Sequence, residues 1–313
     1  MQEIIINIKD LIYPVFVKEG KAVREKIPSM PGIYRLPPDT IVREIEELVR
    51  QGVGGVLLFG IPEKKDKFGS RAYKKDSVVA RAIIKLKESF PKLIVMTDVC
   101  LCAYISHGHC GIIKPSYISC QSSAKIDNIA TLKVLAQMAL SHAEAGADYV
   151  APSAMAKGQV SAIRKTLDAH GFKGTKIMGY SAKYASNFYG PFRDACDSSP
   201  AFGDRSSYQL SYSKSSSAIK EIAADIKEGA DIVMVKPALS YLDIIKEASS
   251  RFRTPLAAYN VSGEYAMVKH SAKLGILDEK KIVFEIMASI KRAGADLIIT
   301  YHAKDIARWL KKN

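Results

Sequence analysis

The stretch that decides the fold is Gly146-Ala147-Asp148-Tyr149-Val150-Ala151, whose first three residues occur again at 229–231 and at 294–296. Each copy follows a segment with helical spacing of apolar residues and precedes a short apolar run. Glycine ends a helix well because it adopts the left-handed backbone conformation without a steric penalty. Each copy therefore predicts a joint between a helix and a strand, and three such joints indicate a repeating βα architecture.

Eight short apolar runs predict buried strands. The runs are nearly continuous rather than alternating, which is typical of strands covered on both faces. They lie at 12–17, 56–60, 93–98, 149–153, 176–181, 232–236, 256–261 and 297–301. The clearest helical segments between them lie at 41–51, 77–89, 132–145, 218–229 and 281–293. Eight strands joined by crossover helices predict an α/β fold, a single closed (β/α)8 TIM barrel.

A doubly wound open sheet is the alternative architecture. It requires a glycine-rich phosphate-binding turn after the first strand, and the stretch Val17-Lys18-Glu19-Gly20 lacks that pattern. A length of 313 residues is within the range of one-domain barrels. We therefore expect residues 11–313 to form one catalytic barrel domain, preceded by a short N-terminal extension at residues 1–10.

Composition and charge exclude several classes of protein. The formal net charge is +14, but the lysines are spread beside acids or at element ends, without an aromatic-interleaved basic stripe, so we expect no nucleic-acid partner. No stretch approaches the ~20 apolar residues that span a membrane. Residues 1–7 lack the basic segment and cleavage site of a secretory signal, and the five cysteines do not form a disulfide framework. These features predict a cytoplasmic protein.

Three cysteines occur within eleven residues, directly after the predicted strand 93–98. Cys100, Cys102 and Cys110 share this run with His107 and His109. Three thiolates that leave a fourth position open are typical of a catalytic zinc site. The alternative is three buried structural thiols, but the neighbouring histidines favour zinc. His109 is equally suited to be a ligand or to support one.

Lys236 follows the apolar run Ile232-Val233-Met234-Val235. Burial of an amine disfavours its charged form and lowers its pKa, and a second lysine nearby, Lys183, would act in the same direction. Such amines form Schiff bases with carbonyl substrates. The alternative is a lysine that extends from a strand end into solvent; we favour that interpretation for Lys183 taken alone, but not for Lys236.

Polar residues gather at the predicted carboxyl ends of the strands, which is where barrel enzymes build their active sites. These residues are Asp98, Ser153, Lys183, Lys236, Ser262 and Tyr301. Two long polar insertions, at 114–128 and 194–217, are typical of lid or binding loops. Cys120 and Cys196 lie in these insertions as inert thiols or extra ligands. Arg193 and Arg205 suit a lid that clamps an anionic substrate, although ordinary surface arginines are the alternative.

These residues resemble one family over nearly the whole chain, from about Asp10 to Leu310: porphobilinogen synthase, also called 5-aminolevulinate dehydratase. The matching motifs are Leu11-Ile12-Tyr13-Pro14-Val15-Phe16-Val17, Ile27-Pro28-Ser29-Met30-Pro31-Gly32-Ile33-Tyr34-Arg35, the cysteine run, Lys183-Tyr184-Ala185-Ser186-Asn187-Phe188-Tyr189-Gly190-Pro191-Phe192-Arg193, Gly203-Asp204-Arg205, residues 233–238 and Val261-Ser262-Gly263-Glu264-Tyr265-Ala266-Met267.

The resemblance implies a (β/α)8 enzyme of haem and other tetrapyrrole synthesis that condenses two 5-aminolevulinate molecules into porphobilinogen, with loss of two waters. It implies that Lys236 forms a Schiff base with the first substrate, on the P side, and Lys183 with the second, on the A side. The remaining implied roles are zinc ligands for Cys100, Cys102 and Cys110; assistance at the centre for Asp98 and Ser153; an A-side carboxylate clamp for Arg193, Arg205 and Gln209; and a P-side clamp for Ser262 and Tyr301.

The chain departs from the family pattern at several positions. Ala154 and Lys157 stand where the family usually has acids, and we expect this change to lower the pKa values of the two reactive lysines further or to disturb the loop. His302 replaces an aromatic residue, and the loop after Cys110 is long. The N-terminal arm that wraps a neighbouring subunit is expected to be short, so the homo-oligomer is an octamer, a hexamer or a dimer. Glu221 matches an allosteric magnesium ligand of some members.

Two other functions remain as alternatives. The first is a catalytically inactive relative that acts as a binding or scaffold protein, which Ala154 and Lys157 favour and the retained lysines and cysteines oppose. The second is a different aldolase that uses Lys236 alone, which leaves the three cysteines and Lys183 unexplained.

Overall fold

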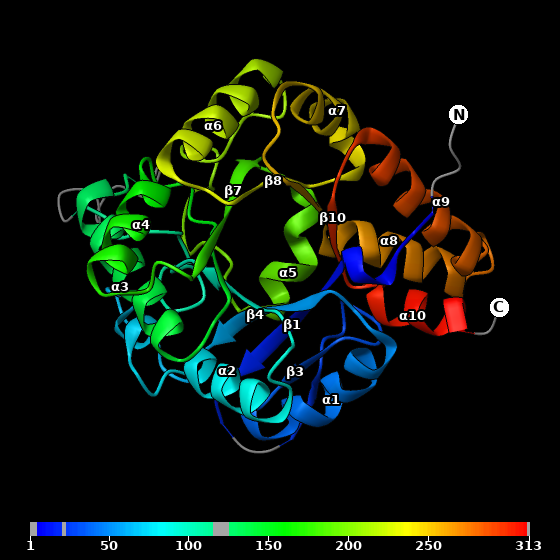
Figure 1. Cartoon of the computed structure of the whole chain (residues 1–313), viewed down its shortest axis with the longest axis horizontal. Coiled ribbons are helices and arrows are strands. Elements are labelled where there is room, and N and C mark those ends of the chain that lie inside the picture. Colours follow the sequence, from blue (N-terminus) through cyan, green and yellow to red (C-terminus); the bar gives the residue numbers. More distant parts are fainter. Residues whose placement is uncertain (1–4, 21–22, 115–124, 312–313) are drawn as a thin grey trace.

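Eight parallel strands close into a barrel, and helices surround it (Figure 1). The structure, a computed structural model, describes residues 5–20, 23–114 and 125–311. In order around the barrel, the strands are β1 (Leu11–Lys18), β4 (Gly55–Ile61), β5 (Val95–Val99), β6 (Tyr149–Pro152), β7 (Lys176–Lys183), β8 (Ile232–Lys236), β9 (Leu256–Asn260) and β10 (Leu297–Thr300). Leu11 of β1 pairs in parallel with Ile298 of β10, which closes the barrel. The predicted barrel is confirmed, and the open sheet is excluded.

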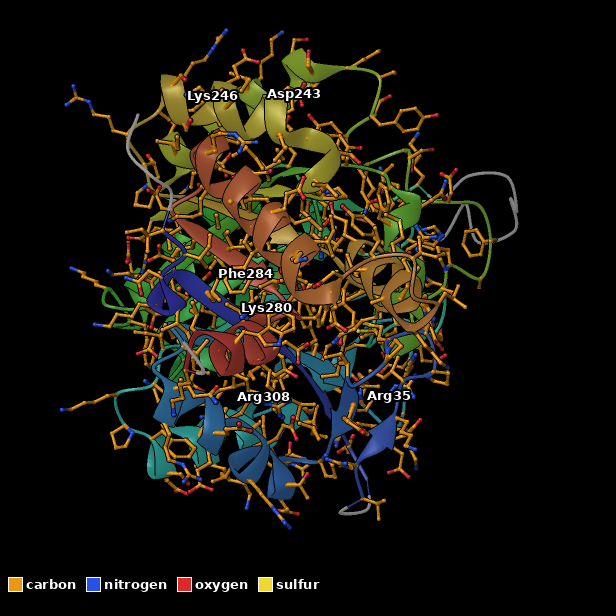
Figure 2. The ribbon with its side chains drawn as sticks, turned by 90° about the vertical axis from the view of Figure 1, so that its right-hand side faces the viewer. Arg35, Asp243, Lys246, Lys280, Phe284 and Arg308 are labelled. Carbon is orange, nitrogen blue, oxygen red and sulfur yellow. The ribbon has the colours of Figure 1, made fainter. Side chains whose placement is uncertain are left out.

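The outer helices cover the barrel strands. They are α1 (Pro38–Gln51), α2 (Val78–Ser89), α3 (Asn128–Glu144), α4 (Gln159–Ala169), α6 (Ser215–Glu228), α7 (Leu242–Arg251), α9 (Glu279–Ala293) and α10 (Ala303–Lys311). The five predicted helices are among them. Figure 2 shows the face that carries α9 and α10, where the rings of Phe284 and Trp309 lie 6.0 Å apart. Within the described residues, no helix is long and apolar enough to cross a membrane.

Several smaller elements lie outside the regular βα repeat. They are the 3-10 turns η1 (Ile8–Asp10), η2 (Ser70–Tyr73), η4 (Asn187–Tyr189) and η5 (Leu239–Tyr241), the helices α5 (Gly190–Ala195) and α8 (Ser262–Lys273), and the strands β2 (Glu25–Lys26) and β3 (Tyr34–Leu36). β3 extends the sheet beside β1 and pairs with β2 in the antiparallel direction. Helix α5 crosses the barrel axis in Figure 1, and its Phe192 packs edge-on against Phe59 of β4. Short, proline- and glycine-rich sequence hides β2 and β3 from a periodicity analysis.

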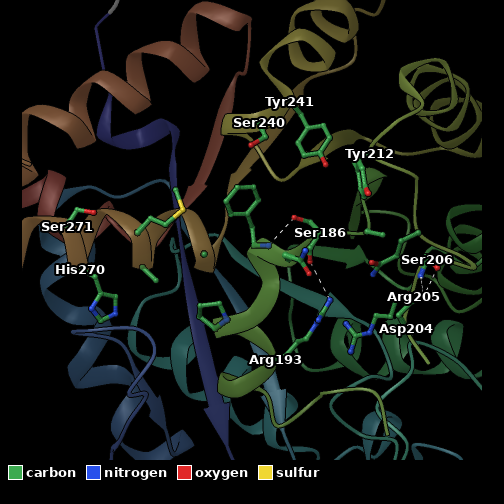
Figure 3. Close-up of a pocket in the computed structure, with 18 residues that line it drawn as sticks. Ser186, Arg193, Asp204, Arg205, Ser206, Tyr212, Ser240, Tyr241, His270 and Ser271 are labelled. Carbon is green, nitrogen blue, oxygen red and sulfur yellow. Dashed lines mark hydrogen bonds between the residues drawn. The ribbon is translucent and has the colours of Figure 1, made fainter. Parts of the chain in front are cut away.

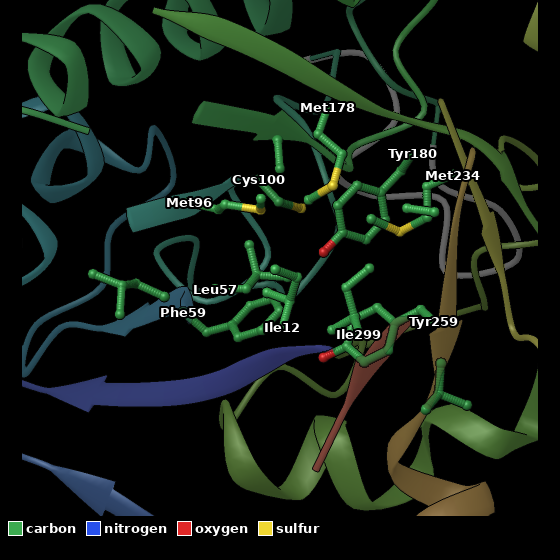
Figure 4. Close-up of a cluster of buried hydrophobic side chains, with 14 of the residues drawn as sticks. Ile12, Leu57, Phe59, Met96, Cys100, Met178, Tyr180, Met234, Tyr259 and Ile299 are labelled. Carbon is green, nitrogen blue, oxygen red and sulfur yellow. The ribbon is translucent and has the colours of Figure 1, made fainter. Parts of the chain in front are cut away.

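The barrel interior is a packed core and not a channel. Side chains from separate strands point inward and meet in the middle (Figure 4). They include Ile12, Leu57, Met96, Met178, Tyr180, Met234, Tyr259 and Ile299, all of them buried. Layers of large inward side chains are the usual filling of this fold. The polar groups of the site therefore rest on an apolar base.

Each Gly-Ala-Asp repeat makes the same pair of hydrogen bonds at the amino-terminal end of the barrel, and we call this arrangement the aspartate clasp. The glycine has a left-handed backbone, with φ of 102°, 102° and 116° in the three copies. The aspartate carboxylate accepts from a backbone N–H at the start of the preceding strand, from its first residue in two copies and its second in the other, and its own N–H donates to the carbonyl of that same residue. The pairs are Asp148 with Val95 (2.7 and 3.0 Å), Asp231 with Ile177 (2.8 and 2.9 Å) and Asp296 with Leu256 (2.8 and 2.8 Å).

A β-bulge in β7 changes the pairing of β7 with β8. Met178 is opposite Ile232 and Gly179 is opposite Val233, but after the bulge Ala182 is opposite Val235 and Lys183 is opposite Lys236. β7 therefore contains one extra residue. Tyr180 points into the barrel, so in a strand without the bulge Ala182 would also point inward and Lys183 would point outward. A bulge of this kind redirects the side chains that follow it. The bulge makes Lys183 the direct neighbour of Lys236.

Candidate active site

The two lysines lie side by side at the carboxyl ends of β7 and β8, and both are buried, with 5% and 4% exposure. The Lys183 ammonium donates a 2.6 Å hydrogen bond to the backbone carbonyl of Ser153, the residue that directly follows β6. Asp98, near the end of β5, lines the same small cavity as Ser153 and both lysines. The structure thus brings together four residues that the sequence placed on four different strands.

The surroundings of Lys236 favour its neutral form. Burial lowers its pKa to about 7, and the charge of Lys183 acts in the same direction, while Asp98 opposes both. Its Nζ lies 4.1 Å from the centre of the Tyr259 ring and 5.1 Å from that of Tyr180. For Asp98, burial raises the pKa of the carboxyl, whereas Lys183 and a side-chain hydrogen bond with Ser153 lower it. The site therefore holds an amine that is partly unprotonated near neutral pH.

The three cysteines converge directly beyond β5. The sulfurs of Cys100, Cys102 and Cys110 all lie within 4.8 Å of one another, and all three side chains are buried. Hydrogen bonds from the Cys100 and Cys102 thiols lower the pKa of Cys110. Three converging thiol donors fit a soft or borderline metal such as zinc, so the donor set is suited to the predicted ion.

The fourth described cysteine, Cys196, lies outside this group of three. It is buried and lines a small cavity together with Cys100 and Cys102. Burial raises the pKa of its thiol well above the usual value. Of the two interpretations from the sequence, the inert thiol therefore fits Cys196 better. Cys120 falls within 115–124, outside the described residues, as does most of the predicted insertion at 114–128.

His109 uses both ring nitrogens in hydrogen bonds. Its Nε2 lies 3.0 Å from the Phe202 carbonyl oxygen, and its Nδ1 lies 3.1 Å from the Tyr208 hydroxyl. A carbonyl only accepts, so Nε2 carries the proton and Nδ1 accepts from the hydroxyl. Of the two roles left open by the sequence, this arrangement favours support of the cysteine loop over metal ligation.

The predicted A-side clamp lines a cavity of about 1260 Å³ (Figure 3). Arg193 reaches it from α5, and Arg205 and Gln209 reach it from the 194–217 insertion. Among the described residues, the Nε atoms of both arginines and both amide atoms of Gln209 are buried without a hydrogen-bond partner. Buried polar atoms are nearly always paired in proteins, so this set is suited to receive an anionic group.

The predicted P-side residues are already engaged within the protein. The Ser262 hydroxyl donates to the Phe188 carbonyl (3.2 Å) and accepts from the Phe192 backbone N–H (3.0 Å). The Tyr301 hydroxyl pairs with that of Tyr259 at 3.0 Å. Sequence reasoning missed Tyr259, which contacts both Lys236 and Tyr301, because an aromatic residue inside an apolar strand has the pattern of core. Its position on a predicted strand that ends at the site is the signal that could have found it.

The residues that depart from the family pattern occupy different environments. Ala154 is buried, while the Lys157 side chain is exposed and its backbone carbonyl accepts from Asn128 Nδ2 at 2.9 Å. The charges that act most strongly on Lys236 are those of Lys183 and Asp98. The expectation that Lys157 lowers the pKa of Lys236 therefore stays without structural support.

Two further predicted or unusual residues lie away from the two lysines. Glu221 is exposed on α6, which packs on the outside of β7 and β8. His302 is buried against the Tyr265 ring, at 4.5 Å between ring centres, close to Glu279 and Asp305. Those two carboxylates both accept hydrogen bonds from Lys269. A cation of the chain itself therefore already pairs with both carboxylates.

Comparison with known proteins gives a consistent result. The family model described as delta-aminolevulinic acid dehydratase matches residues 1–309. Curated relatives of that name include one from Bacillus subtilis, 49% identical over 310 residues (99% of this chain and 93% of the relative), and one from Archaeoglobus fulgidus, 52% identical over 303 residues (97% and 91%). A crystal structure of delta-aminolevulinic acid dehydratase (porphobilinogen synthase) from Toxoplasma gondii ME49, in complex with the reaction product porphobilinogen, superposes with a TM-score of 0.94. It is 43% identical and covers 98% of this chain and 86% of that chain.

Proposed function

This chain belongs to the delta-aminolevulinic acid dehydratase family, and from that premise we propose how its own residues perform the family's reaction. The enzyme is a lyase that condenses two 5-aminolevulinate molecules into porphobilinogen, with loss of two waters, for haem and other tetrapyrrole synthesis. The observation that carries the residue assignment is the pairing of Lys183 with Lys236 beside the three cysteines.

Two ketone substrates need two amines. We assign the P-side Schiff base to Lys236, whose unprotonated nitrogen attacks the ketone carbon so that a C–N bond forms and the ketone oxygen leaves as water. Lys183 does the same for the A-side substrate, oriented by its hydrogen bond to the Ser153 carbonyl. The bulge in β7 supports the use of both lysines, since with it Lys183 and Lys236 are register partners on neighbouring strands.

Asp98 is suited to accept and return protons between the two substrates. It is buried, it faces both lysines, and burial and the two ammonium charges act on its pKa in opposite directions. Burial is the largest of these influences, so the pKa of the Asp98 carboxyl is raised above its ordinary value, toward the range that general acid–base catalysis requires. The nearby Ser153 side chain acts in the opposite direction to burial and lowers the pKa of this carboxyl.

The carboxylate of each substrate needs its own partner. Arg193, Arg205 and Gln209 offer buried donors without partners to the A-side carboxylate. Ser262 would serve the P side once its present hydrogen bond to Phe188 is exchanged for the substrate, and Tyr301 would donate to the same carboxylate while its hydroxyl accepts from Tyr259. These contacts hold each ketone in front of its lysine.

Cys100, Cys102 and Cys110 would hold the zinc ion, which supplies a Lewis acid at the A side when bound. The buried sulfur triplet supports this assignment. Our proposal also includes a homo-oligomer (dimer, hexamer or octamer) and a magnesium ion at Glu221, both on the strength of the family resemblance. Sedimentation with and without magnesium, for the chain and for Glu221→Ala, tests these two parts.

The first experiment measures porphobilinogen formed from 5-aminolevulinate, as pyrrole colour, with and without a zinc chelator. We expect product that disappears on chelation and returns with zinc. Product that persists after the metal has been shown to be stripped would contradict the catalytic zinc and keep the lysines. Folded, zinc-loaded protein that forms no product would favour the inactive relative. Full activity of Lys183→Ala would favour the aldolase that uses Lys236 alone.

A further inference from the structure

We propose that His109 and Tyr208 form a latch that joins the metal end of the active site to its carboxylate end. Tyr208 is the positioning residue of this latch: it acts through Cys110 and Arg205 rather than on the substrate. The inference rests on the proposed zinc ligands and carboxylate clamp, and it adds that the two sites are energetically coupled.

The latch is a short chain of directed hydrogen bonds. The Tyr208 hydroxyl donates to His109 Nδ1 (3.1 Å), and His109 Nε2–H donates to the Phe202 carbonyl (3.0 Å). The backbone N–H of Cys110 donates to the same tyrosine hydroxyl (3.3 Å). One hydroxyl therefore donates to the histidine and accepts from the residue that carries a proposed zinc ligand.

The latch connects residues 107–110 with residues 198–209, and the bonded residues are 93–99 positions apart in sequence. Further contacts join the same two segments, and we call this set of contacts the seam. Arg205 Nη2 donates to the Gly108 carbonyl at 2.8 Å, and the Ala201 N–H donates to the His107 carbonyl at 3.1 Å. A Cβ on Gly108 would lie 2.3 Å from the Ser199 carbonyl oxygen, so the two backbones approach as closely as glycine allows. Segment 198–209 is thus attached along its length to the cysteine loop.

Burial makes the latch more than a surface contact. His109 is fully buried, and its ring centre lies 5.0 Å from that of Phe202. Loss of a single partner would leave a buried donor or acceptor unpaired, which costs more than the bond itself contributes. Partly broken forms of the seam are therefore disfavoured relative to the fully bonded form.

Coupling follows from which residues the seam holds. Cys110 is held through the Tyr208 hydroxyl, and Arg205, which belongs to the carboxylate clamp, is held at the Gly108 carbonyl, two residues before Cys110. A metal that holds Cys110 and an anion that holds Arg205 both favour the closed seam, so each ligand strengthens binding of the other by the same factor. A latch that only stabilised the fold would give no such reciprocity.

The test compares Tyr208→Phe with Tyr212→Phe, a matched change at an exposed tyrosine that lines the same cavity as Arg205 but is not a residue of the latch. Zinc affinity of the full chain is measured by chelator competition, with and without levulinate, a 4-keto acid that lacks the amino group of the substrate. We expect levulinate to tighten zinc binding by about 5-fold or more, the usual lower range of coupling, in the wild type and in Tyr212→Phe, and by less than 2-fold in Tyr208→Phe. Equal coupling in all three proteins would overturn the latch.

Hydrogen exchange of residues 198–209 gives a second readout, which also separates the latch from the proposed metal site. If the wild type binds no zinc at the cysteines, the proposed metal site is wrong. Hydrogen exchange of the zinc-free proteins then tests the latch by itself. Faster exchange in Tyr208→Phe than in Tyr212→Phe supports it, and equal exchange overturns it. Should Tyr208→Phe fail to fold, His109→Phe replaces it, because it keeps the buried ring and removes both side-chain hydrogen bonds.

Discussion

Lys236 can attack a ketone only when its nitrogen is unprotonated, and burial brings its pKa to about 7. Below that pH the amine is protonated and inactive, so we expect kcat/KM to rise about tenfold per pH unit up to pH 7 and then to level off. The measurement is the pH profile of kcat/KM from pH 5 to 9, with zinc content determined at each pH. A kcat/KM that still rises tenfold per pH unit at pH 9, as an ordinary lysine pKa of about 10.4 would give, would contradict the assigned environment.

Tyr259 is the residue whose importance the sequence did not reveal. Its hydroxyl orients Tyr301, and its ring lies over the Lys236 nitrogen. Tyr259→Phe keeps the ring and removes one hydrogen bond, worth about 1 kcal/mol, so we expect KM to rise about fivefold with kcat nearly unchanged. Steady-state kinetics check this. A drop in kcat at constant KM would mean that the hydroxyl takes part in the chemistry instead.

Sequence reasoning selects residues of unusual chemistry and passes over ordinary ones. A lysine at the end of an apolar run, or a cluster of cysteines, has few structural explanations, so Lys236 and Cys100 were identified and the structure places them at one end of the barrel. A tyrosine within a strand, or in a serine-rich loop, has many structural explanations. Tyr259 and Tyr208 therefore become visible only when the folded chain shows what their hydroxyls contact.

The helices and strands of the structure match the apolar pattern of the sequence where that pattern extends over many residues. All eight predicted strands and five predicted helices are present. The β7 bulge and helix α5 were not predicted, because a bulge changes the pairing between strands without changing the composition of either, and a six-residue helix spans fewer than two turns of the helical period. Both of these features shape the site.

The aspartate clasp gives a prediction at the level of one strand pair. Asp148 accepts from the Val95 N–H and from Lys87, and Asp148→Ala would remove both. We expect a loss of about 1–3 kcal/mol in the free energy of unfolding, with Tm lower by about 2–4 °C per kcal/mol and unchanged activity at 25 °C. Thermal unfolding measures it. Glu144→Ala, which removes a nearby surface carboxylate, serves as the control, and an equal Tm for the two variants would show that the clasp contributes nothing.

The stability of the whole molecule is expected to depend on Asp225 of α6. Burial, followed by the charges of Glu228 and Glu221, raises its pKa to about 7, while a hydrogen bond with Ser181 opposes the shift. The folded state therefore holds a proton that the unfolded chain, with a pKa near 3.9, has released. Stability should fall as pH rises from about 4 to 7 and stay constant above that, a loss of about 2–3 kcal/mol between pH 5 and pH 8.

The matching measurement is denaturant unfolding at several pH values, in the wild type and in Asp225→Asn. The difference between the two proteins isolates this carboxyl from the other groups that titrate. We expect the variant to gain stability relative to the wild type as pH rises. A constant difference across the range would show that Asp225 ionises normally.

The three aspartate clasps also fix the register between neighbouring strands of the barrel. Successive residues of a strand face opposite sides, so a slip of one position exchanges everything inside for everything outside. Asp231 fixes the position of Ile177 at the amino-terminal end of the β7–β8 pair. The bulge then shifts the register of β7 against β8 by one residue before the carboxyl end of the pair. Asp231 does not contact the substrate, but it sets the strand register in which Lys183 and Lys236 are direct neighbours.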